Sequence, residues 1–422
     1  MDTIFALSSG APPAGIAVIR ISGGGARNAL ERLVGNVPEP RTLRFAALRN
    51  GDQLLDRGLV AFLPGPATAT GEDIAELHLH GGRAVVAAVE AALSEFPGLR
   101  RAEAGEFTRL AFANGRIDLA EAEGLADLLT AETELQRRSA LEMASGRFSR
   151  NVVEWRERLL MLSAQVEAVL DFDDEGDVDG LRPSFTGSIN LLRDSIAETL
   201  AWPQAETLRD GFRIALVGPP NAGKSTLFNA LVEHEAAITS AAAGTTRDVL
   251  ERPVAIEGVP LVFVDMAGLR DTEDEVEAIG VERARAELGR ADLVLWLGRE
   301  GQGPPGAWDI ESQIDRVGRR AKVSPRFRVS AVTGEGIPEL KRALVDHARQ
   351  AMPKPGSAAL NARQRRFLEQ SSNALERAQS INDPLLIAEN LRTARAAFDA
   401  LMGKTATEDM LDALFGRFCI GK

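Results

Sequence analysis

Residues 213–226 read RIALVGPPNAGKST, and this stretch decides the fold of the region around it. A short apolar strand, Ile214 to Val217, runs into the pattern Gly-x-x-x-x-Gly-Lys-Ser, and TLFNALVEH then begins a helix. In this strand–turn–helix context the glycines let backbone N–H groups surround phosphate oxygens at the positive end of a helix. Lys224 is placed to reach the terminal phosphates, and the Ser225 hydroxyl to bind Mg²⁺. The stretch therefore predicts the phosphate-binding loop of an α/β nucleotide-binding domain.

Downstream residues supply the other parts of a nucleotide switch. Asp265 ends the apolar strand of VPLVFVDMAGLR, where its carboxylate is suited to holding Mg²⁺ through water, and the Gly268 N–H follows as a γ-phosphate sensor. Thr245 and Thr246 lie between the two motifs, in a predicted loop. A loop threonine that closes on Mg²⁺ is how switch loops respond to the γ-phosphate. The order of loop lysine, switch threonine, Asp-x-x-Gly and a later Ser-Ala predicts a Ras-like GTPase rather than an ATP-dependent kinase.

Two positions depart from the usual GTPase pattern. Leu269 follows Gly268 where Ras-type enzymes carry a glutamine that positions water, so a residue of the acidic stretch RDTEDEVEAIG has to orient the nucleophile. Guanine specificity normally uses Asn-Lys-x-Asp, but the best match here is SQID, in which Asp315 remains while the Asn and the Lys are replaced. Ser330 and Ala331 match the later loop that contacts guanine O6. These residues predict GTP over ATP, with weaker affinity than a complete motif gives.

Composition limits the class of protein. The 422 residues are 45% hydrophobic and 26% charged, as in globular proteins, and the length suits about three domains. The single cysteine, Cys419, excludes an intramolecular disulfide and favours a reducing compartment. The net charge of -12 argues against sequence-independent coating of nucleic acid. The start of the chain lacks a signal-peptide pattern and no apolar run reaches the roughly 18 residues that span a bilayer, so we expect a cytoplasmic protein without a membrane partner.

The pattern of expected elements changes along the chain. Residues 1–117 read as mixed α/β, with strands in GIAVIRIS, LVAFLP and EDIAELHLHGG and a helix in RAVVAAVEAALSEF. Residues 118–207 and 351–422 carry apolar residues at helical spacing. Residues 208–350 alternate β-rich runs with helices, as a parallel-sheet domain does. Because the ends of a compact domain commonly lie close together, the simplest arrangement is one helical domain with the α/β domain inserted into it.

From end to end, the chain resembles the MnmE (TrmE) family of tRNA-modification GTPases. The blocks that carry the resemblance are GIAVIRISG, TGEDIAELHLHGG, AGEFTRLAFANGRIDLAEAEGLADL, GPPNAGKSTLFNAL, AGTTRDVL, DMAGLR with DEVEAIGVERA, and the terminal FCIGK. Several such blocks in one order are more specific than a single phosphate loop. The resemblance implies a multidomain protein with an α/β N-terminal folate-binding and dimerisation domain, an all-α helical domain, and an inserted Ras-like α/β G domain of the P-loop NTPase class.

The resemblance also implies an activity and partners. Members of the family are homodimers that work with a flavoprotein, MnmG (GidA), on tRNA. Together they install a carboxymethylaminomethyl-type group at C5 of the wobble uridine, using a one-carbon unit from a tetrahydrofolate derivative. Hydrolysis of GTP, with Mg²⁺ and K⁺ as cofactors, drives a conformational change rather than the carbon chemistry. The chain is therefore expected to be a potassium-stimulated GTP hydrolase that takes part in tRNA modification.

Site residues carry over to the positions that match the family's motifs. Glu277 matches the glutamate that positions the attacking water, which answers the question raised by Leu269, whereas Met266 departs from the family's usual threonine. The expected nucleotide-binding residues are Asn221, Ala222, Gly223, Lys224, Ser225, Thr226, Thr245, Thr246, Asp265, Gly268, Asp315, Ser330 and Ala331. The implied metal ligands are Ser225 and Thr246 for Mg²⁺, and Asn221, Ser240, Ala242 (through its carbonyl) and Thr245 for K⁺. The implied folate contacts are Arg20, Glu76, Arg116 and Lys422.

Cys419 keeps two interpretations. It packs as a small apolar residue in the last helical turn, or it takes part in the modification chemistry beside the folate, because a folate contact from Lys422 requires the terminus to dock.

Two other functions remain open. One is an RNA-binding ribosome-assembly GTPase switch, against which the folate-like N-terminal blocks and the terminal Cys-x-Gly-Lys argue. The other is a degenerate G domain that acts as a nucleotide-binding scaffold, which the incomplete SQID motif suggests.

Overall fold

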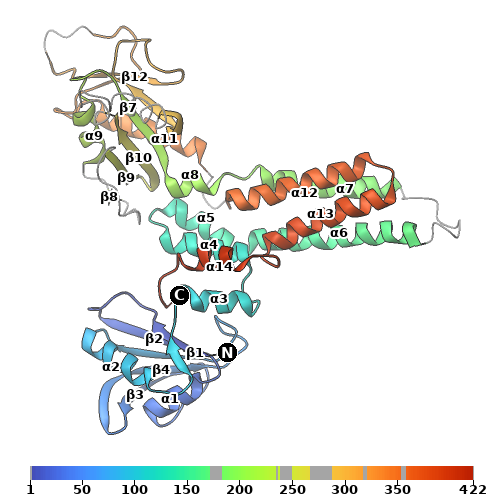
Figure 1. The fold of residues 1–422 in the computed structure, drawn as a ribbon. Helices are drawn as coiled ribbons and strands as arrows, with labels where there is room; N and C mark the ends of the chain where they lie inside the picture. The colour runs from blue at the N-terminus through green and yellow to red at the C-terminus, as the bar shows by residue number, and fades with distance from the viewer. Residues whose placement is uncertain are drawn as a thin grey trace, which may run out of the picture. The chain divides into compact units, whose positions relative to one another are not determined.

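The computed structural model describes residues 2–171, 183–233, 236–237, 250–266, 288–316, 321–352 and 358–421. The chain divides into two units, each with its own β-sheet and helices (Figure 1). The first unit comprises Met1–Ala126, Ser149–Glu154 and Arg395–Lys422, and the second comprises Asp127–Phe148 and Trp155–Ala394. Two separate sheets together with a long helical region confirm the predicted multidomain fold class.

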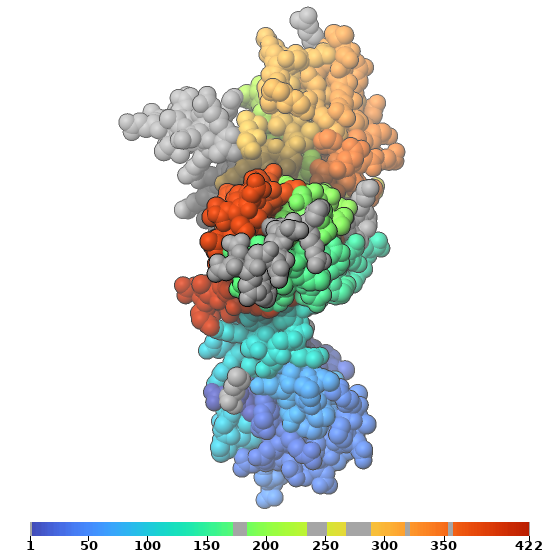
Figure 2. Space-filling view, turned by 90° about the vertical axis from the view of Figure 1, so that its right-hand side faces the viewer, coloured from blue at the N-terminus to red at the C-terminus, as the bar shows by residue number. Residues whose placement is uncertain are grey.

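The sheet of the first unit has six strands in the order β3-β4-β5-β2-β1-β6. The strands are β1 (Thr3–Leu7), β2 (Ile16–Ser22), β3 (Leu43–Asn50), β4 (Gln53–Leu63), β5 (Ile74–His80) and β6 (Leu99–Arg101). Alternate apolar residues of the strands share one core with helices α1 (Ala26–Val34) and α2 (Arg83–Ser94), which therefore cover one face of the sheet. Figure 2 shows this N-terminal region, in blue, as one closely packed body. The strands and the helix expected in this region are present.

The opposite face of this sheet is covered in part. Helix α3 (Glu106–Ala113) packs on it through Phe107, which joins Ile4 and Ala6 of β1 in a small core. Farther along the same face Leu43, Phe45 and Leu59, on β3 and β4, are exposed, and Phe45 leaves 66% of its surface accessible. Large apolar side chains gathered on one sheet face usually mark a surface that another molecule covers.

The last helix of the chain packs within the first unit. Helix α4 (Leu119–Thr130) contributes Leu119 and Ala122 to a core that also contains Leu411 and Phe415 of α14 (Glu408–Phe415). Arg109 of α3 adds ion pairs to Glu408 and Asp412. Residues 119–122 and residues 411–418, which are far apart in the sequence, therefore form one hydrophobic core.

The helical part of the second unit consists of long helices from two distant parts of the sequence. They are α5 (Glu134–Ala144), α7 (Pro183–Leu200) and α12 (Ala362–Ser380), together with most of α6 (Arg147–Asp171) and of α13 (Pro384–Leu401), whose residues 149–154 and 395–401 belong to the first unit. Helices α7 and α12 lie side by side, and the Arg193 guanidinium donates to Gln379 at 3.1 Å (Figure 1). In the described part of the chain, the helices fall short of the length and hydrophobicity needed to cross a membrane.

The sheet of the second unit has seven strands in the order β13-β12-β11-β7-β10-β9-β8. They are β7 (Phe212–Val217), β8 (Ala236–Ala237), β9 (Leu250–Ile256), β10 (Val259–Asp265), β11 (Leu293–Trp296), β12 (Trp308–Ser312) and β13 (Phe327–Val329). Strands β10, β7, β11, β12 and β13 run parallel, and β9 forms an antiparallel hairpin with β10 around Glu257 and Gly258. Helices α9 (Lys224–Val232) and α11 (Ile337–Ala351) share the main core with one face.

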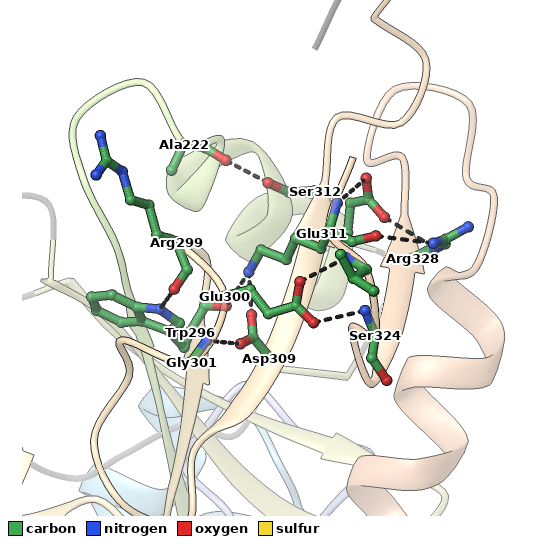
Figure 3. Close-up of polar contacts among 12 residues, drawn as sticks. Ala222, Trp296, Arg299, Glu300, Gly301, Asp309, Glu311, Ser312, Ser324 and Arg328 are labelled. Carbon is green, nitrogen blue, oxygen red and sulfur yellow. Dashed lines mark hydrogen bonds and ion pairs between the residues drawn. The ribbon is translucent and has the colours of Figure 1, made fainter. Parts of the chain in front are cut away.

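One part of this sheet differs from the expected alternation of strands and helices. Residues 297–307 join β11 to β12 without a helix, and the described residues between β12 and β13 are also non-helical. On the face away from α9 and α11, charged pairs replace helix packing: Lys322 pairs with Asp309, and Arg328 with Glu311 at 3.0 Å (Figure 3). Glu300 accepts from the backbone N–H groups of residues 323 and 324, so the two connecting loops are joined to each other. These charged partners suit Asp309 and Glu311, whereas the apolar face of a helix packed here would bury the two carboxylates without partners.

The chain enters and leaves the second sheet at neighbouring points. The N–H of Ala205, the first residue of α8 (Ala205–Asp210), donates to the Leu360 carbonyl at 2.9 Å, and the Leu360 N–H donates to Pro203 O at 3.0 Å. The start and the end of the segment between residues 205 and 360 therefore lie close together, as the ends of an inserted domain must.

Helix α5 begins with a capping box that can be tested directly. The Thr133 hydroxyl accepts from the Gln136 N–H at 3.2 Å, and Gln136 Oε1 accepts from the Thr133 N–H at 2.9 Å. Thr133→Ala should lower the opening free energy of α5 by about 1 kcal/mol, because the first turn loses its cap. Amide hydrogen exchange of α5 should become about fivefold faster, since 1.4 kcal/mol is a factor of about ten. Thr133→Ser keeps the hydroxyl and serves as the control; equal exchange in both variants would contradict the prediction.

Candidate functional site

The phosphate-binding loop predicted from the sequence is formed by residues 218–223, between β7 and α9. Gly223 has φ 88° and Asn221 has φ 61°, so the loop turns through two left-handed residues just before the helix. A Cβ on Gly218 would lie 3.0 Å from the Leu297 Cβ, which shows how closely the neighbouring strand end approaches. The loop thus has the tight turn and close packing for which glycine is needed.

Lys224 lies over this loop. The residue is 8% exposed, and Nζ donates to the carbonyl oxygens of Gly218 at 2.9 Å and Pro219 at 3.0 Å. Ser225 and Thr226 occupy the exposed first turn of α9, whereas Ala222 is buried beneath the loop. A nearly buried ammonium group beside the N-terminus of a helix favours an anion, which makes this the position for phosphate groups.

Asp265 reaches the same edge of the sheet as the loop. It is the last residue of β10, it pairs in register with Leu216 of the parallel strand β7, and its side chain is 2% exposed. Met266, the departure from the family pattern, is buried and packs with Val262 and Val264, so an apolar residue fits that position. The structure therefore brings together the Lys224 and Asp265 motifs, which lie 41 positions apart by their residue numbers (265 − 224).

The SQID segment lies against the phosphate-binding loop. The Ser312 hydroxyl donates to the Ala222 carbonyl at 2.6 Å (Figure 3), and Gln313 Nε2 donates to the Asn221 carbonyl at 3.3 Å. Sequence reasoning selected Asp315 in this segment and missed Ser312 and Gln313, because both differ from the usual Asn and Lys. The sequence signal that could have found them was their place in the motif, at the Asn and Lys positions.

Asp315 and Ser330 are paired at the ends of neighbouring strands. The Ser330 hydroxyl donates to Asp315 Oδ1 at 2.6 Å, and this hydrogen bond holds the pKa of Asp315 below its usual range. The carboxylate is therefore ionised and accepts hydrogen bonds at neutral pH. Ala331 follows Ser330 and is half-buried. An anionic acceptor beside the loop suits a base that presents N–H donors.

Several predicted site residues lie outside the described residues. They are Ser240, Ala242, Thr245, Thr246, Gly268, Glu277 and Lys422.

A second candidate site lies on the partly covered face of the N-terminal sheet. Arg20 and Glu76 are opposite each other on β2 and β5, and the Arg20 guanidinium donates to Glu76 Oε1 through Nη2 at 2.8 Å and through Nε at 3.1 Å. Nε2 of His78, on the same face, lies 3.4 Å from Glu76 Oε2. The sequence marked Arg20 and Glu76 through the family resemblance, and it did not connect His78 with them.

Arg116 approaches the same region from the residues after α3. A Cβ on Gly71 would lie 3.3 Å from Arg116 Cγ, so the arginine stem packs on this glycine, and Arg116 itself is exposed. The neighbouring Thr70 hydroxyl lies 2.7 Å from the hydroxyl of Ser22, two residues beyond Arg20 on β2. The loop that contains Gly71 therefore connects the surroundings of Arg116 with those of the Arg20–Glu76 pair.

The C-terminal segment docks on β1. The Gly421 carbonyl accepts from the Ser8 hydroxyl at 2.8 Å, and Ile420 forms a β-bridge with Ala104. Phe418 is buried in the core that contains Phe415, with ring centres 6.1 Å apart. Cys419 lies between these anchored residues and is exposed, so the packing interpretation of this thiol is wrong.

Comparisons with known proteins agree with this architecture. Residues 3–116 match the family described as GTP-binding protein TrmE N-terminus, and residues 119–419 match the MnmE helical domain. The chain is 62% identical over 436 residues to the tRNA modification GTPase MnmE of Novosphingobium aromaticivorans, with 100% of each chain covered. It is 61% identical over 424 residues to the protein of the same name from Erythrobacter litoralis, again with 100% of each covered.

The docking of the C-terminal segment depends on Gly421. This residue has φ 95°, and a Cβ would collide with the Leu7 carbonyl oxygen. Gly421→Ala should therefore release the segment, and carboxypeptidase should remove the terminal residues roughly tenfold faster than from the wild type. Gly10→Ala is the matched control, because a Cβ there meets nothing within 4 Å. Equal trimming of the two variants would show that the close approach does not hold the terminus.

Proposed function

The chain belongs to the MnmE family of tRNA modification GTPases, and on this premise we propose a function for each of its two sites. The G domain hydrolyses GTP with Mg²⁺ and K⁺. The N-terminal domain holds a tetrahydrofolate derivative that carries a one-carbon unit. Together with the flavoprotein MnmG (GidA), a cytoplasmic homodimer of this chain installs a carboxymethylaminomethyl-type group at C5 of the wobble uridine of tRNA. The observation that carries the proposal is the presence in one chain of a buried phosphate-loop lysine, Lys224, and a separate ion-paired site, Arg20–Glu76.

In the G domain, each residue has a distinct role in nucleotide binding. Lys224 binds the terminal phosphates, supported by the Gly223 N–H group, by the turn of the loop at Ala222 and by the first turn of α9. Ser225 and Thr246 hold Mg²⁺, with Asp265 acting through water and Gly268 sensing the γ-phosphate. The fit rests on charge: the loop offers a buried cation to phosphate, and Asp265 offers a buried carboxylate to a divalent metal. Asp315, Ser330 and Ala331 bind the guanine base.

Hydrolysis requires a group that orients water. Leu269 has no hydrogen-bonding atom in its side chain, so the Glu277 carboxylate takes this role. Four residues bind K⁺: Asn221, Ser240, Ala242 through its carbonyl, and Thr245. The support from the described residues is Asn221, which is exposed at the left-handed turn of the loop. A cation bound there supplies positive charge next to the phosphates.

The N-terminal site suits the chemistry of a folate. The pterin ring presents N–H donors that match Glu76, and the glutamate tail carries carboxylates that match Arg116 and Lys422. Arg20 donates two hydrogen bonds to Glu76 Oε1 and so orients the carboxylate, whose Oε2 lies 3.4 Å from His78 Nε2. The exposed thiol of Cys419 lies on the docked C-terminal segment and is available for the modification chemistry. The exposed side chains Leu43, Phe45 and Leu59 give the same domain an apolar surface that supports homodimer formation.

The modified nucleoside provides the direct test of this function. Mass spectrometry of tRNA from cells that lack the protein should show unmodified wobble uridine, and the wild-type chain should restore the modification. Arg20→Ala should fail to restore it while keeping GTP turnover, because only the folate site is changed. Arg49→Ala replaces an exposed arginine of the same sheet and should restore it fully. A normal nucleoside profile in cells without the protein would refute the proposal.

The hydrolytic role of Glu277 is tested by kinetics. Glu277→Ala should lower the kcat for GTP about 100-fold or more, because water is no longer oriented, while the affinity for a fluorescent GDP analogue stays within twofold. Wild-type turnover should be faster in K⁺ than in Na⁺ at equal ionic strength. Glu339→Ala changes an exposed glutamate on α11 and serves as the control. Unchanged turnover of Glu277→Ala would assign the role to another residue.

A further inference from the structure

The incomplete guanine motif makes two contacts that its sequence does not suggest. Ser312 and Gln313 stand where the usual motif has Asn and Lys, and each donates a hydrogen bond to a successive carbonyl of the phosphate-binding loop. We propose that Ser312 and Gln313 are positioning residues that hold the loop in its phosphate-binding shape and couple it to the guanine site at Asp315. The inference rests on the proposed role of Asp315.

The Ser312 contact is buried at both ends. Ser312 is 4% exposed and Ala222 3% exposed, and the distance between the hydroxyl and the carbonyl oxygen is 2.6 Å. Strand alternation places Ser312 on the same side of β12 as the core residues Trp308 and Ile310. A short side chain is sufficient here because the end of β12 already lies against the loop. Without the hydroxyl, the Ala222 carbonyl would lose this buried hydrogen bond.

The Gln313 contact joins two residues with unusual backbone conformations. Gln313 has φ 57° and Asn221 has φ 61°, and both are in the left-handed region. The Gln313 side chain lies over Gly223: a Cβ on this glycine would be 3.0 Å from Nε2 and 3.2 Å from Cγ. Backbone conformations of this kind cost free energy and persist where the surrounding structure holds them. The glutamine contact is one element of that support.

Holding the carbonyl groups also fixes the amide groups that bind phosphate. In a trans peptide the C=O of one residue and the N–H of the next point in opposite directions. When Ser312 binds the Ala222 carbonyl, the Gly223 N–H is turned to the other side. Likewise, Gln313 on the Asn221 carbonyl turns the Ala222 N–H into the loop, where it donates to Pro219 O at 3.3 Å. The two side chains thus set the directions of consecutive N–H groups.

The same short segment carries the base-binding carboxylate. Asp315 lies two residues after Gln313 and is held by the Ser330 hydroxyl at 2.6 Å. A base bound at Asp315 therefore restrains residues 312–315, and through Ser312 and Gln313 it also restrains the phosphate-binding loop. Loss of either the Ser312 or the Gln313 hydrogen bond to the loop should speed nucleotide release. The preference for guanine over adenine should stay unchanged, because Asp315 stays in place.

The test measures release of fluorescent GDP and relative GDP and ADP affinities in the full-length protein. Ser312→Ala and Gln313→Ala should each release GDP about tenfold faster than wild type, which corresponds to about 1.4 kcal/mol. Ser312→Thr keeps the hydroxyl and should restore slow release. Ser324→Ala and Gln302→Ala are matched controls, since both residues are exposed in the same domain outside the nucleotide loops. When both hydrogen bonds are removed together, their effects on the release rate should be non-additive, because both hold the same loop.

The outcomes separate the inference from the guanine assignment. Release at the control rate in both Ser312→Ala and Gln313→Ala would overturn the inference, and Gln313→Ala alone decides it if Ser312→Ala does not fold. Asp315→Asn should shift the preference from GDP to xanthosine diphosphate, because an amide then faces the base where a carboxylate did. If that preference does not change while the Ser312 and Gln313 hydrogen bonds still control release, Asp315 is not the guanine-binding residue. The positioning role of Ser312 and Gln313 then stands.

Discussion

A short backbone pairing between Leu360 and residues 203–205 is the constraint on which the second unit depends. Its two hydrogen bonds bring the start and the end of a long nucleotide-binding segment to one place. Because of this pairing, α7 and α12 can lie side by side although the whole G-domain sheet lies between them in sequence. The core of the inserted sheet also includes Leu135 of α5 and Leu208 of α8, so the helical part contributes residues to it.

Within the G domain, hydrogen bonds to backbone carbonyls organise the site. Lys224, Ser312 and Gln313 each donate to carbonyl groups of the loop between β7 and α9. These hydrogen bonds fix the orientations of the loop peptides beside the Lys224 ammonium group. The chemistry of the loop thus depends as much on the side chains behind it as on its glycines.

Local patterns were enough to predict much of this architecture. The strand before Gly218, the hairpin at Gly258 and the long helices follow from spacing and turn residues that lie within one segment. The Ser312–Ala222 contact joins residues 90 positions apart, and the place of Ser312 in the guanine motif was its one signal in the sequence. The missing helix after β11 had a weak signal in the turn-rich GREGQGPPG, together with the charged residues Asp309 and Glu311 on an otherwise apolar strand. Glu277 remains a prediction from resemblance.

The docked C-terminal segment has a consequence for biosynthesis. Ser8 and Gly421, which share a hydrogen bond, are separated by 413 positions, and α14 shares a core with Leu119. During translation the N-terminal sheet emerges first, but its contacts with residues 415–421 form only after almost all of the chain has left the ribosome. The inserted G domain, in contrast, has its strands close together in sequence and can fold as a unit before that. Completion of the N-terminal unit is therefore a late step, because it needs residues from both distant segments.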